Sequence, residues 1–327
     1  MTFPNGTSSA STCNKGTAVT SGGYHQTSPS QFDQPYSAAI VYLTGTERTR
    51  ATDTLTSLEM LARNVPLERP YPILMMHDGG NLADPIYQQA FTDRWTARIE
   101  ELRQSSESVD VLHRMEALRS MIEFVQVDMA PPEDAMRVGM QALNPFFDSN
   151  WPGYHSMCRL FGTRIFTHPR VRDLDFYMRM DTDSFFPEPL AYDPFALAFR
   201  HNLSYAARLQ GTDGPHAVVG LWDCVAEFLQ HHPDLQQRME SNSVSVPPEP
   251  RGSHGFPGWY NNFEIVHLPS FQRLVVVSWL RNVEKHWRGF YQHRWGRSHN
   301  CARSSANDAA FRRCLYQALD DSNVLRV

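Results

Sequence analysis

Tyr177-Met-Arg-Met-Asp-Thr-Asp-Ser-Phe-Phe186 places two aspartates, Asp181 and Asp183, directly after an apolar run that begins at Phe176. The apolar and aromatic residues predict a buried strand that ends at the two carboxylates. Carboxylates held this close repel each other unless a positive charge lies between them. Hard divalent cations prefer oxygen ligands, and a nucleotide diphosphate can complete their coordination shell. The pair is therefore a candidate metal–diphosphate site, although such short strings also occur in solvated turns.

The whole chain has the bulk properties of a globular protein. Its 327 residues, with a hydrophobic share of 41%, suffice for one large domain or two small ones. The net charge of −5, without a long basic tract, argues against nucleic acid as the main partner. No apolar run reaches the roughly 18 residues that a transmembrane helix needs. We therefore expect no membrane span in this chain, and its N-terminus lacks the pattern of a signal peptide.

Composition divides the chain into a stem and a folded domain. Residues 1–34 are rich in Ser, Thr, Gly, Asn and Gln, which bury too little apolar surface to order a segment. We expect a flexible stem there and a catalytic domain over residues 35–327. Within that domain, residues 243–258 are rich in proline, which predicts a long loop that could act as an active-site lid.

The order of the elements predicts an α/β fold. Residues 38–43 and 70–76 have the short apolar pattern of buried strands, and residues 50–64 between them carry leucines at helical spacing. Strand, helix and strand predict a parallel βαβ unit. Further elements are expected as largely helical structure at 84–121, a strand at 123–127 and a helix at 154–166.

The five cysteines do not favour a zinc site, because no two of them form a Cys-x-x-Cys pair. We expect Cys158 to be a buried apolar residue. In an oxidising compartment, one or two disulfides among Cys158, Cys224, Cys301 and Cys314 are compatible with the sequence, with no pairing favoured.

Several motifs together carry a family resemblance. They are Met157-Cys-Arg before the aspartate strand, Asn261-Asn-Phe-Glu-Ile-Val266, and Gly289-Phe-Tyr-Gln-His-Arg-Trp-Gly296. In this order and spacing, the chain resembles glycosyltransferase family 15, the fungal-type α-1,2-mannosyltransferases, over roughly residues 37 to 320. The resemblance implies a GT-A-type nucleotide-sugar-binding fold, with a single large domain and a mixed central sheet flanked by helices. It also implies GDP-mannose as donor, Mn²⁺ or another divalent cation, and a Golgi or secretory-pathway lumen.

The resemblance also assigns the metal ligands. Asp181 aligns with the family's metal-contacting glutamate, and the Pro-Gly that follows in the family is replaced here by Thr-Asp, which adds Asp183. This departure strengthens the metal interpretation but leaves the donor sugar open. The family supplies a histidine to the metal after Arg-Trp-Gly. Asp308 occupies that place if an insertion lies in the loop, and His299 is the rival; a helix-capping role for Asp308 is an equal alternative.

Glu264 matches the glutamate of the family's Asn-Phe-Glu motif. It lies between aromatic residues and an apolar run, so we expect it to be at least partly buried, where a carboxylate needs partners or a function. In a retaining transfer it would face the anomeric carbon, either as nucleophile or as a charge that stabilises an oxocarbenium-like state. The competing interpretation is a structural hydrogen-bond acceptor.

The remaining candidates concern nucleotide and acceptor. Guanidinium groups suit bidentate phosphate binding, so Arg179 and Arg159 are expected at the diphosphate. Trp259 and Tyr260 are candidates for stacking on an acceptor sugar, with plain core packing as the alternative. Weaker nucleotide candidates follow the first two strands, where ligands gather in open α/β sheets: Thr44, Arg48 and Asp78.

These observations favour a metal-dependent retaining glycosyltransferase that adds mannose in α-1,2 linkage to a mannosylated glycan or glycoprotein. A GT-A enzyme with another nucleotide sugar is the first alternative. A non-catalytic carbohydrate-binding relative is the second. A metal-dependent phosphohydrolase built on the aspartate pair is disfavoured, because it leaves the Asn-Phe-Glu and Arg-Trp-Gly motifs unexplained.

Overall fold

A computed structural model describes residues 36–45, 48–146, 148–242, 256–296 and 323–326. The chain divides into two units, Met1–Gln34 and Pro35–Val327, and all the described residues belong to the second. No helix among the described residues is long and apolar enough to cross a membrane.

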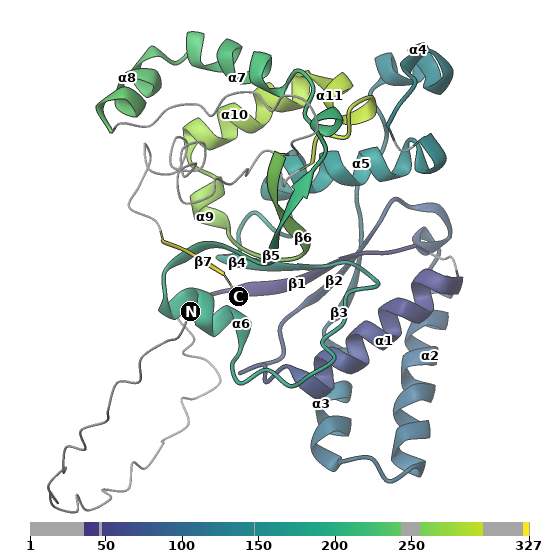
Figure 1. Cartoon of the computed structure of the whole chain (residues 1–327). Helices are drawn as coiled ribbons and strands as arrows, with labels where there is room; N and C mark the ends of the chain where they lie inside the picture. Colours follow the sequence, from purple (N-terminus) through teal and green to yellow (C-terminus); the bar gives the residue numbers. More distant parts are fainter. Residues whose placement is uncertain (1–35, 46–47, 147, 243–255, 297–322, 327) are drawn as a thin grey trace, which may run out of the picture. The chain divides into compact units, whose positions relative to one another are not determined.

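A mixed sheet lies at the centre of the second unit (Figure 1). Its strand order is β3-β2-β1-β4-β6-β5-β7, and the strands span Ala38–Leu43 (β1), Ile73–His77 (β2), Ile122–Gln126 (β3), Phe176–Met180 (β4), Leu203–Asp213 (β5), Phe256–His267 (β6) and Asn323–Arg326 (β7). Strands β1 to β4 are mutually parallel, and β6 runs antiparallel to both β4 and β5. The expected βαβ unit is therefore confirmed, as is the strand that ends at the aspartates.

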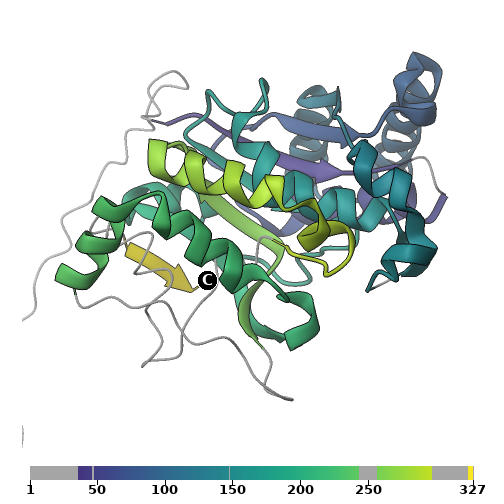
Figure 2. The ribbon, with the colours of Figure 1, turned by 90° about the horizontal axis from the view of Figure 1, so that it is seen from above.

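Helices cover both faces of this sheet. They span Arg48–Asn64 (α1), Pro85–Gln104 (α2), Val109–Ser120 (α3), Glu133–Leu143 (α4), Gly153–Arg159 (α5), Pro194–Arg200 (α6), Leu221–Gln230 (α7), Pro233–Ser241 (α8), Leu268–Phe271 (α9), Leu274–Lys285 (α10) and Trp287–Tyr291 (α11). Helices α1, α2, α3 and α6 lie on one face, and α5, α7, α10 and α11 lie on the other (Figures 1 and 2).

Alternation along the strands divides the core into two layers. On β4, Tyr177 belongs to the cluster shared with α5, α7, α10 and α11, whereas Met178 and Met180 belong to the cluster shared with α1, α2 and α3. Arg179 therefore faces the α5 side together with Tyr177. The only polar residue of β4 is thus directed into a largely apolar layer, where its charge needs partners.

Several expected boundaries shift by one to three residues, as in β2, which begins at Ile73, and two differ more. The helix expected over 154–166 is shorter: α5 ends at Arg159, and Leu160–Arg164 form a π-helical turn before a 3₁₀ turn at Ile165–Thr167. The end of the expected loop at 256–258 is already strand, because β6 begins at Phe256 and pairs with β5 there. Its proline did not end the strand, since Pro257 is near the strand's first residue.

The described cysteines are reduced. Cys158 and Cys224 are buried free thiols, as expected for Cys158. Both lie in the apolar layer on the α5 side of the sheet. Cys301 and Cys314 lie outside the described residues.

Candidate functional site

Several candidates lie together at the carboxyl ends of the parallel strands. Thr44 follows β1, Asp78 follows β2 and Asp181 follows β4. Thr44 is buried and its N–H donates to the Met76 carbonyl at 2.8 Å, while Asp78 is exposed. In open α/β sheets, ligands bind just outside the carboxyl ends of the strands. The structure thus places these three residues where a nucleotide site is expected.

The two aspartates differ in their surroundings. The Asp181 side chain is 26% exposed, and Asp183 is exposed. Burial raises the pKa of Asp181, and the nearby charge of Asp183 raises it further, whereas Arg179 opposes both. The effect of the Asp183 charge on Asp181 means that the two carboxylates lie close enough to repel each other. A divalent cation between them would relieve that repulsion, so the pair fits the hard-cation site predicted from the sequence.

Arg179 is the buried cation of the site. Its residue is 3% exposed, its Nε donates to Asp181 Oδ1 at 2.9 Å, and its guanidinium carbon lies 4.0 Å from the centre of the Phe161 ring. Burial disfavours its charge, but Asp181 and Glu264 outweigh this and raise the pKa of the Arg179 guanidinium. The side chain therefore stays charged and links the aspartate loop to the next strand.

Glu264 lies directly across the sheet from Arg179. The antiparallel register of β4 and β6 pairs Arg179 with Glu264, and Glu264 has no exposed surface. Residues paired in this way have Cβ atoms about 4.5–5.5 Å apart, on the same face of the sheet. The hydroxyl of Tyr205 on β5 donates to Glu264 Oε2 at 2.8 Å. The expected burial of Glu264 is confirmed. Its strand, β6, lies between β4 and β5.

Hydrogen bonds from two other elements fix the aspartate loop. The Asp181 N–H and the Ser184 hydroxyl both donate to the Asn262 carbonyl on β6, at 3.0 and 3.1 Å. From α1, the Ser57 hydroxyl donates to the Ser184 carbonyl at 2.6 Å. These contacts hold the loop between β6 and α1, so the positions of both carboxylates depend on segments far apart in the sequence.

Two of the other candidates lie in structural surroundings. Arg159 pairs with Glu284 of α10 at 3.0 Å, and its NH1 group donates to the Ala130 carbonyl at 3.4 Å. Trp259 is 3% exposed and its ring lies 6.2 Å from that of Tyr205. The packing alternative for Trp259 thus has structural support, and a diphosphate contact by Arg159 would compete with its ion pair.

The Arg-Trp-Gly motif packs beside α5. The Trp295 indole N–H donates to the Val219 carbonyl at 2.9 Å, and the ring lies against Gly289, where an added Cβ would be 2.1 Å from Trp295 Cδ2. Arg294 has a left-handed backbone, with a φ of 65°, and donates to the Tyr154 hydroxyl at 2.9 Å. A non-glycine residue in this conformation is strained, and such residues cluster at functional sites. The motif therefore has both a packing and a positioning role.

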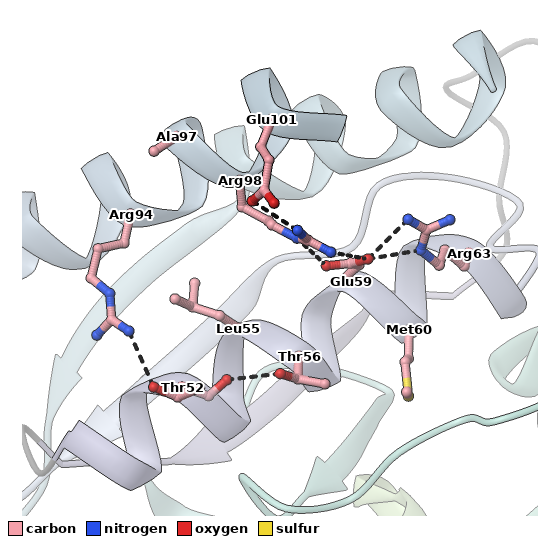
Figure 3. A pocket seen from close by; sticks show the side chains of 10 residues that line it. All are labelled: Thr52, Leu55, Thr56, Glu59, Met60, Arg63, Arg94, Ala97, Arg98 and Glu101. Carbon is pink, nitrogen blue, oxygen red and sulfur yellow. Dashed lines mark hydrogen bonds and ion pairs between the residues drawn. The ribbon is translucent and has the colours of Figure 1, made fainter. Parts of the chain in front are cut away.

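A separate groove of about 610 Å³ lies between α1 and α2. Its charged side chains bond one another: Arg63 and Arg98 both pair with Glu59, and Arg98 also pairs with Glu101 (Figure 3). None of the predicted site residues lines it. Because its carboxylates are engaged by arginines, we interpret the groove as an ion-pair network that joins two helices.

Four candidates cannot be placed. Asp308 and His299 lie outside the described residues, as do the side chains of Arg48 and Tyr260. Within the described part of the chain, no three His, Cys, Asp or Glu residues form a metal-binding group. The third protein ligand thus stays a prediction, with Asp308 and His299 as rivals.

Comparison with known proteins assigns the family. A family model described as glycolipid 2-alpha-mannosyltransferase matches residues 85–307. The chain belongs to this family. The match includes both aspartates, the Asn-Phe-Glu segment and the Arg-Trp-Gly segment, so the family resemblance read from these motifs is confirmed.

Curated relatives are fungal mannosyltransferases. O-glycoside alpha-1,2-mannosyltransferase omh1 of Schizosaccharomyces pombe is 27% identical over 143 residues, which cover 44% of this chain and 36% of that protein. O-glycoside alpha-1,2-mannosyltransferase homolog 5 of the same yeast is 22% identical over 268 residues, which cover 74% of this chain and 59% of that protein. The chain thus spans between about a third and three fifths of the length of these relatives.

A solved structure confirms the fold. Core-mannan synthase A from Aspergillus fumigatus, in its Mn/GDP form, superposes with a TM-score of 0.59 at 18% identity, covering 83% of this chain and 70% of that one. The α/β architecture with a mixed central sheet flanked by helices is therefore the GT-A-type fold that the resemblance implies.

Sequence reasoning did not assign the contacts of three residues. Tyr205 bonds Glu264, Ser57 bonds the aspartate loop, and Arg294 bonds Tyr154. Their roles depend on strand register and helix packing, which single-residue patterns do not specify. Tyr205 had one signal, an aromatic residue in a β-prone run, but nothing in the sequence shows that its hydroxyl points to Glu264.

Proposed function

We propose that this protein is a metal-dependent retaining glycosyltransferase that moves mannose from GDP-mannose, in α-1,2 linkage, to a mannosylated glycan or glycoprotein. Family membership supports the sugar and the linkage, and the Mn/GDP form of the solved relative supports the metal and the nucleotide. The observation that carries the proposal is a group of three charged residues near the carboxyl end of β4. Arg179 lies on β4, Asp181 follows it, and Glu264 lies on the neighbouring strand β6.

Asp181 and Asp183 would hold the divalent cation, with Asp308 or His299 as the third protein ligand. When bound, such a cation neutralises charge on the departing diphosphate. The chain's own contribution is to hold the two carboxylates in place through the Asn262 carbonyl and Ser57. Thr44, Arg48 and Asp78 follow the first two strands and would line the nucleotide side of the same site.

Arg179 acts in the proposed site by balancing charge. It lies between Asp181 and Glu264, and both carboxylates keep it protonated. A direct role at the diphosphate, as the sequence suggested, would require it to leave Asp181 Oδ1, which lies 2.9 Å from its Nε. We therefore assign Arg179 to fixing the two carboxylates, with phosphate contact as a secondary role.

Glu264 would act through its negative charge. Nucleophilic attack requires contact between the carboxylate oxygen and the anomeric carbon at about 3 Å, whereas Glu264 has no exposed surface. A fixed charge near the site stabilises positive charge on the sugar in the transition state without forming a bond. Of the two roles open from the sequence, burial favours the stabilising charge.

Family membership supports the proposals for the acceptor and the compartment. We place the protein in the secretory-pathway lumen, with the Golgi as the specific address. Trp259 and Tyr260 lie in the first half of β6 and are the candidates for the acceptor side. Burial of Trp259 supports core packing as its alternative role.

The proposal is tested with a panel of nucleotide sugars, with and without Mn²⁺. We expect GDP and GDP-mannose to raise the melting temperature only when Mn²⁺ is present, because a ligand that binds the native state stabilises it. Transfer from GDP-mannose to α-methyl mannoside should follow, with the α anomer as product. Stabilisation by a different nucleotide sugar, and not by GDP-mannose, would identify that nucleotide sugar as the donor. Binding of mannan without metal or nucleotide would instead identify a carbohydrate-binding protein.

A further inference from the structure

Residues of two neighbouring strands lie beside Glu264. On one side, Arg179 of β4 is its register partner; on the other, Tyr205 of β5 donates to Oε2 at 2.8 Å. In the β5–β6 register, Ala207 is opposite Glu264 and Tyr205 is opposite Val266. Tyr205 is therefore a diagonal neighbour of Glu264 on the same face, a position that a long aromatic side chain can bridge.

The ring of Tyr205 is itself fixed by packing. Tyr205 is 3% exposed, and its ring centre lies 6.2 Å from that of Trp259 and 6.4 Å from that of Phe271. A tyrosine held between two aromatic rings has little freedom to move its hydroxyl. Because the hydroxyl is fixed in this way, its hydrogen bond to Oε2 restricts the motion of the Glu264 carboxylate.

We propose that Tyr205 is a positioning residue for Glu264, whose hydroxyl fixes the orientation of the carboxylate and stabilises its charge in the apolar layer. This inference rests on the proposed function of Glu264. An acidic group that stabilises a transition state electrostatically is effective only if it does not have to reorganise during the reaction. The Tyr205 hydroxyl, itself fixed by the core, restricts rotation of the carboxylate by engaging Oε2.

The test compares Tyr205→Phe with Tyr36→Phe. Both changes remove a buried tyrosine hydroxyl: that of Tyr36 bonds the Tyr71 hydroxyl at 2.9 Å, before β1 begins and thus at the opposite edge of the sheet from the site. We expect Tyr205→Phe to lower kcat for GDP-mannose transfer by about tenfold to a hundredfold, the range for a hydrogen bond to a charged group. KM for the donor and Kd for GDP with Mn²⁺ should stay within about threefold, and Tyr36→Phe should leave kcat unchanged.

A second measurement does not depend on turnover. Infrared spectra of protein with ¹³C-labelled glutamate should show the Glu264 carboxylate band, identified by its loss in Glu264→Gln, at a shifted position in Tyr205→Phe and at its original position in Tyr36→Phe. An unchanged band in Tyr205→Phe would overturn the contact. A shifted band with wild-type kcat would overturn the positioning role. If the wild-type protein transfers no sugar from any nucleotide, the proposed function fails, and the infrared result still decides the contact.

Discussion

Asp181 and Asp183 are the residues whose charge the proposed metal site requires. We expect Asp181→Asn and Asp183→Asn each to weaken Mn²⁺-dependent GDP binding by at least about tenfold, because each removes a ligand charge at nearly constant shape. The melting temperature without metal should fall little, since the amide oxygen of Asn can still accept from Arg179 and the charge of Glu264 remains. Calorimetric titration of GDP in the presence of Mn²⁺ measures the first effect and a thermal melt the second. Unchanged affinity in both variants would place the metal elsewhere.

The pH dependence of metal binding follows from Asp181. Burial raises its pKa above the ordinary value of 3.8, so the native state binds its proton more tightly than the unfolded state. Its favourable contribution to stability is therefore present at pH values below that ordinary value and is lost as the pH rises through the raised value. Mn²⁺ binds the ionised carboxylate, so the affinity for Mn²⁺ should rise with pH in the range above 3.8.

This dependence is checked by titrating Mn²⁺ between about pH 5 and pH 8 in wild type and in Asp181→Asn. The wild-type affinity should increase over this range more steeply than that of the variant. Equal slopes would mean that the proton released on binding comes from another group.

Glu264 is the residue where a structural role and a functional role are easiest to separate. We expect Glu264→Gln to lower kcat at least about a hundredfold, or about 2.7 kcal/mol, with donor affinity within a few fold. The amide is nearly isosteric and still accepts the Tyr205 hydrogen bond, so packing survives while the charge is lost. Steady-state kinetics with a thermal melt distinguish the outcomes: near-normal turnover contradicts the charge role, and unfolding would favour a structural one.

At the scale of elements, the strands and helices around the site were largely predictable, and their pairing was not. The run Ala38–Leu43 and the run that ends at Met180 are short, apolar and bounded by polar residues, which is the pattern of buried strands. The proline-rich stretch before Trp259 hid the beginning of β6. Without the register of β6, the sequence could not show that Arg179 and Glu264 face each other or that Tyr205 reaches the same carboxylate.

The close packing of Gly289 in α11 against Trp295 leads to a prediction about stability. A Cβ at Gly289 would lie 2.1 Å from Trp295 Cδ2, so Gly289→Ala must displace the indole and its bond to the Val219 carbonyl. We expect the free energy of unfolding to fall by about 2 kcal/mol. The control is Gly153→Ala at the start of α5, where an added Cβ meets nothing within 4 Å. Denaturant unfolding followed by tryptophan fluorescence measures both, and equal stability of the two variants would contradict the packing role.

At the scale of the whole molecule, the boundary at residue 35 separates two units of different composition. We expect a chain that begins at Pro35 to keep the full Mn²⁺-dependent affinity for GDP, because the proposed site lies entirely within Pro35–Val327. Its melting temperature should lie within about 2 °C of that of the full chain, a difference of less than about 1 kcal/mol. Calorimetry on the two chains tests this. A loss of GDP affinity would mean that residues 1–34 contribute to the site.

Arg179 on β4 and Glu264 on β6 also restrict the register in which these two strands can pair during folding. Sliding β6 by one residue would send Glu264 to the other face, into the layer of α1, α2 and α3, and leave Arg179 opposite an apolar side chain. Glu264 would then be a buried charge away from the Tyr205 hydroxyl and from the charge of Arg179, which costs several kcal/mol. The two side chains thus exclude misaligned sheets that apolar residues would tolerate. Replacing both with methionine could raise stability, yet it would remove the penalty that keeps the strands in a single alignment.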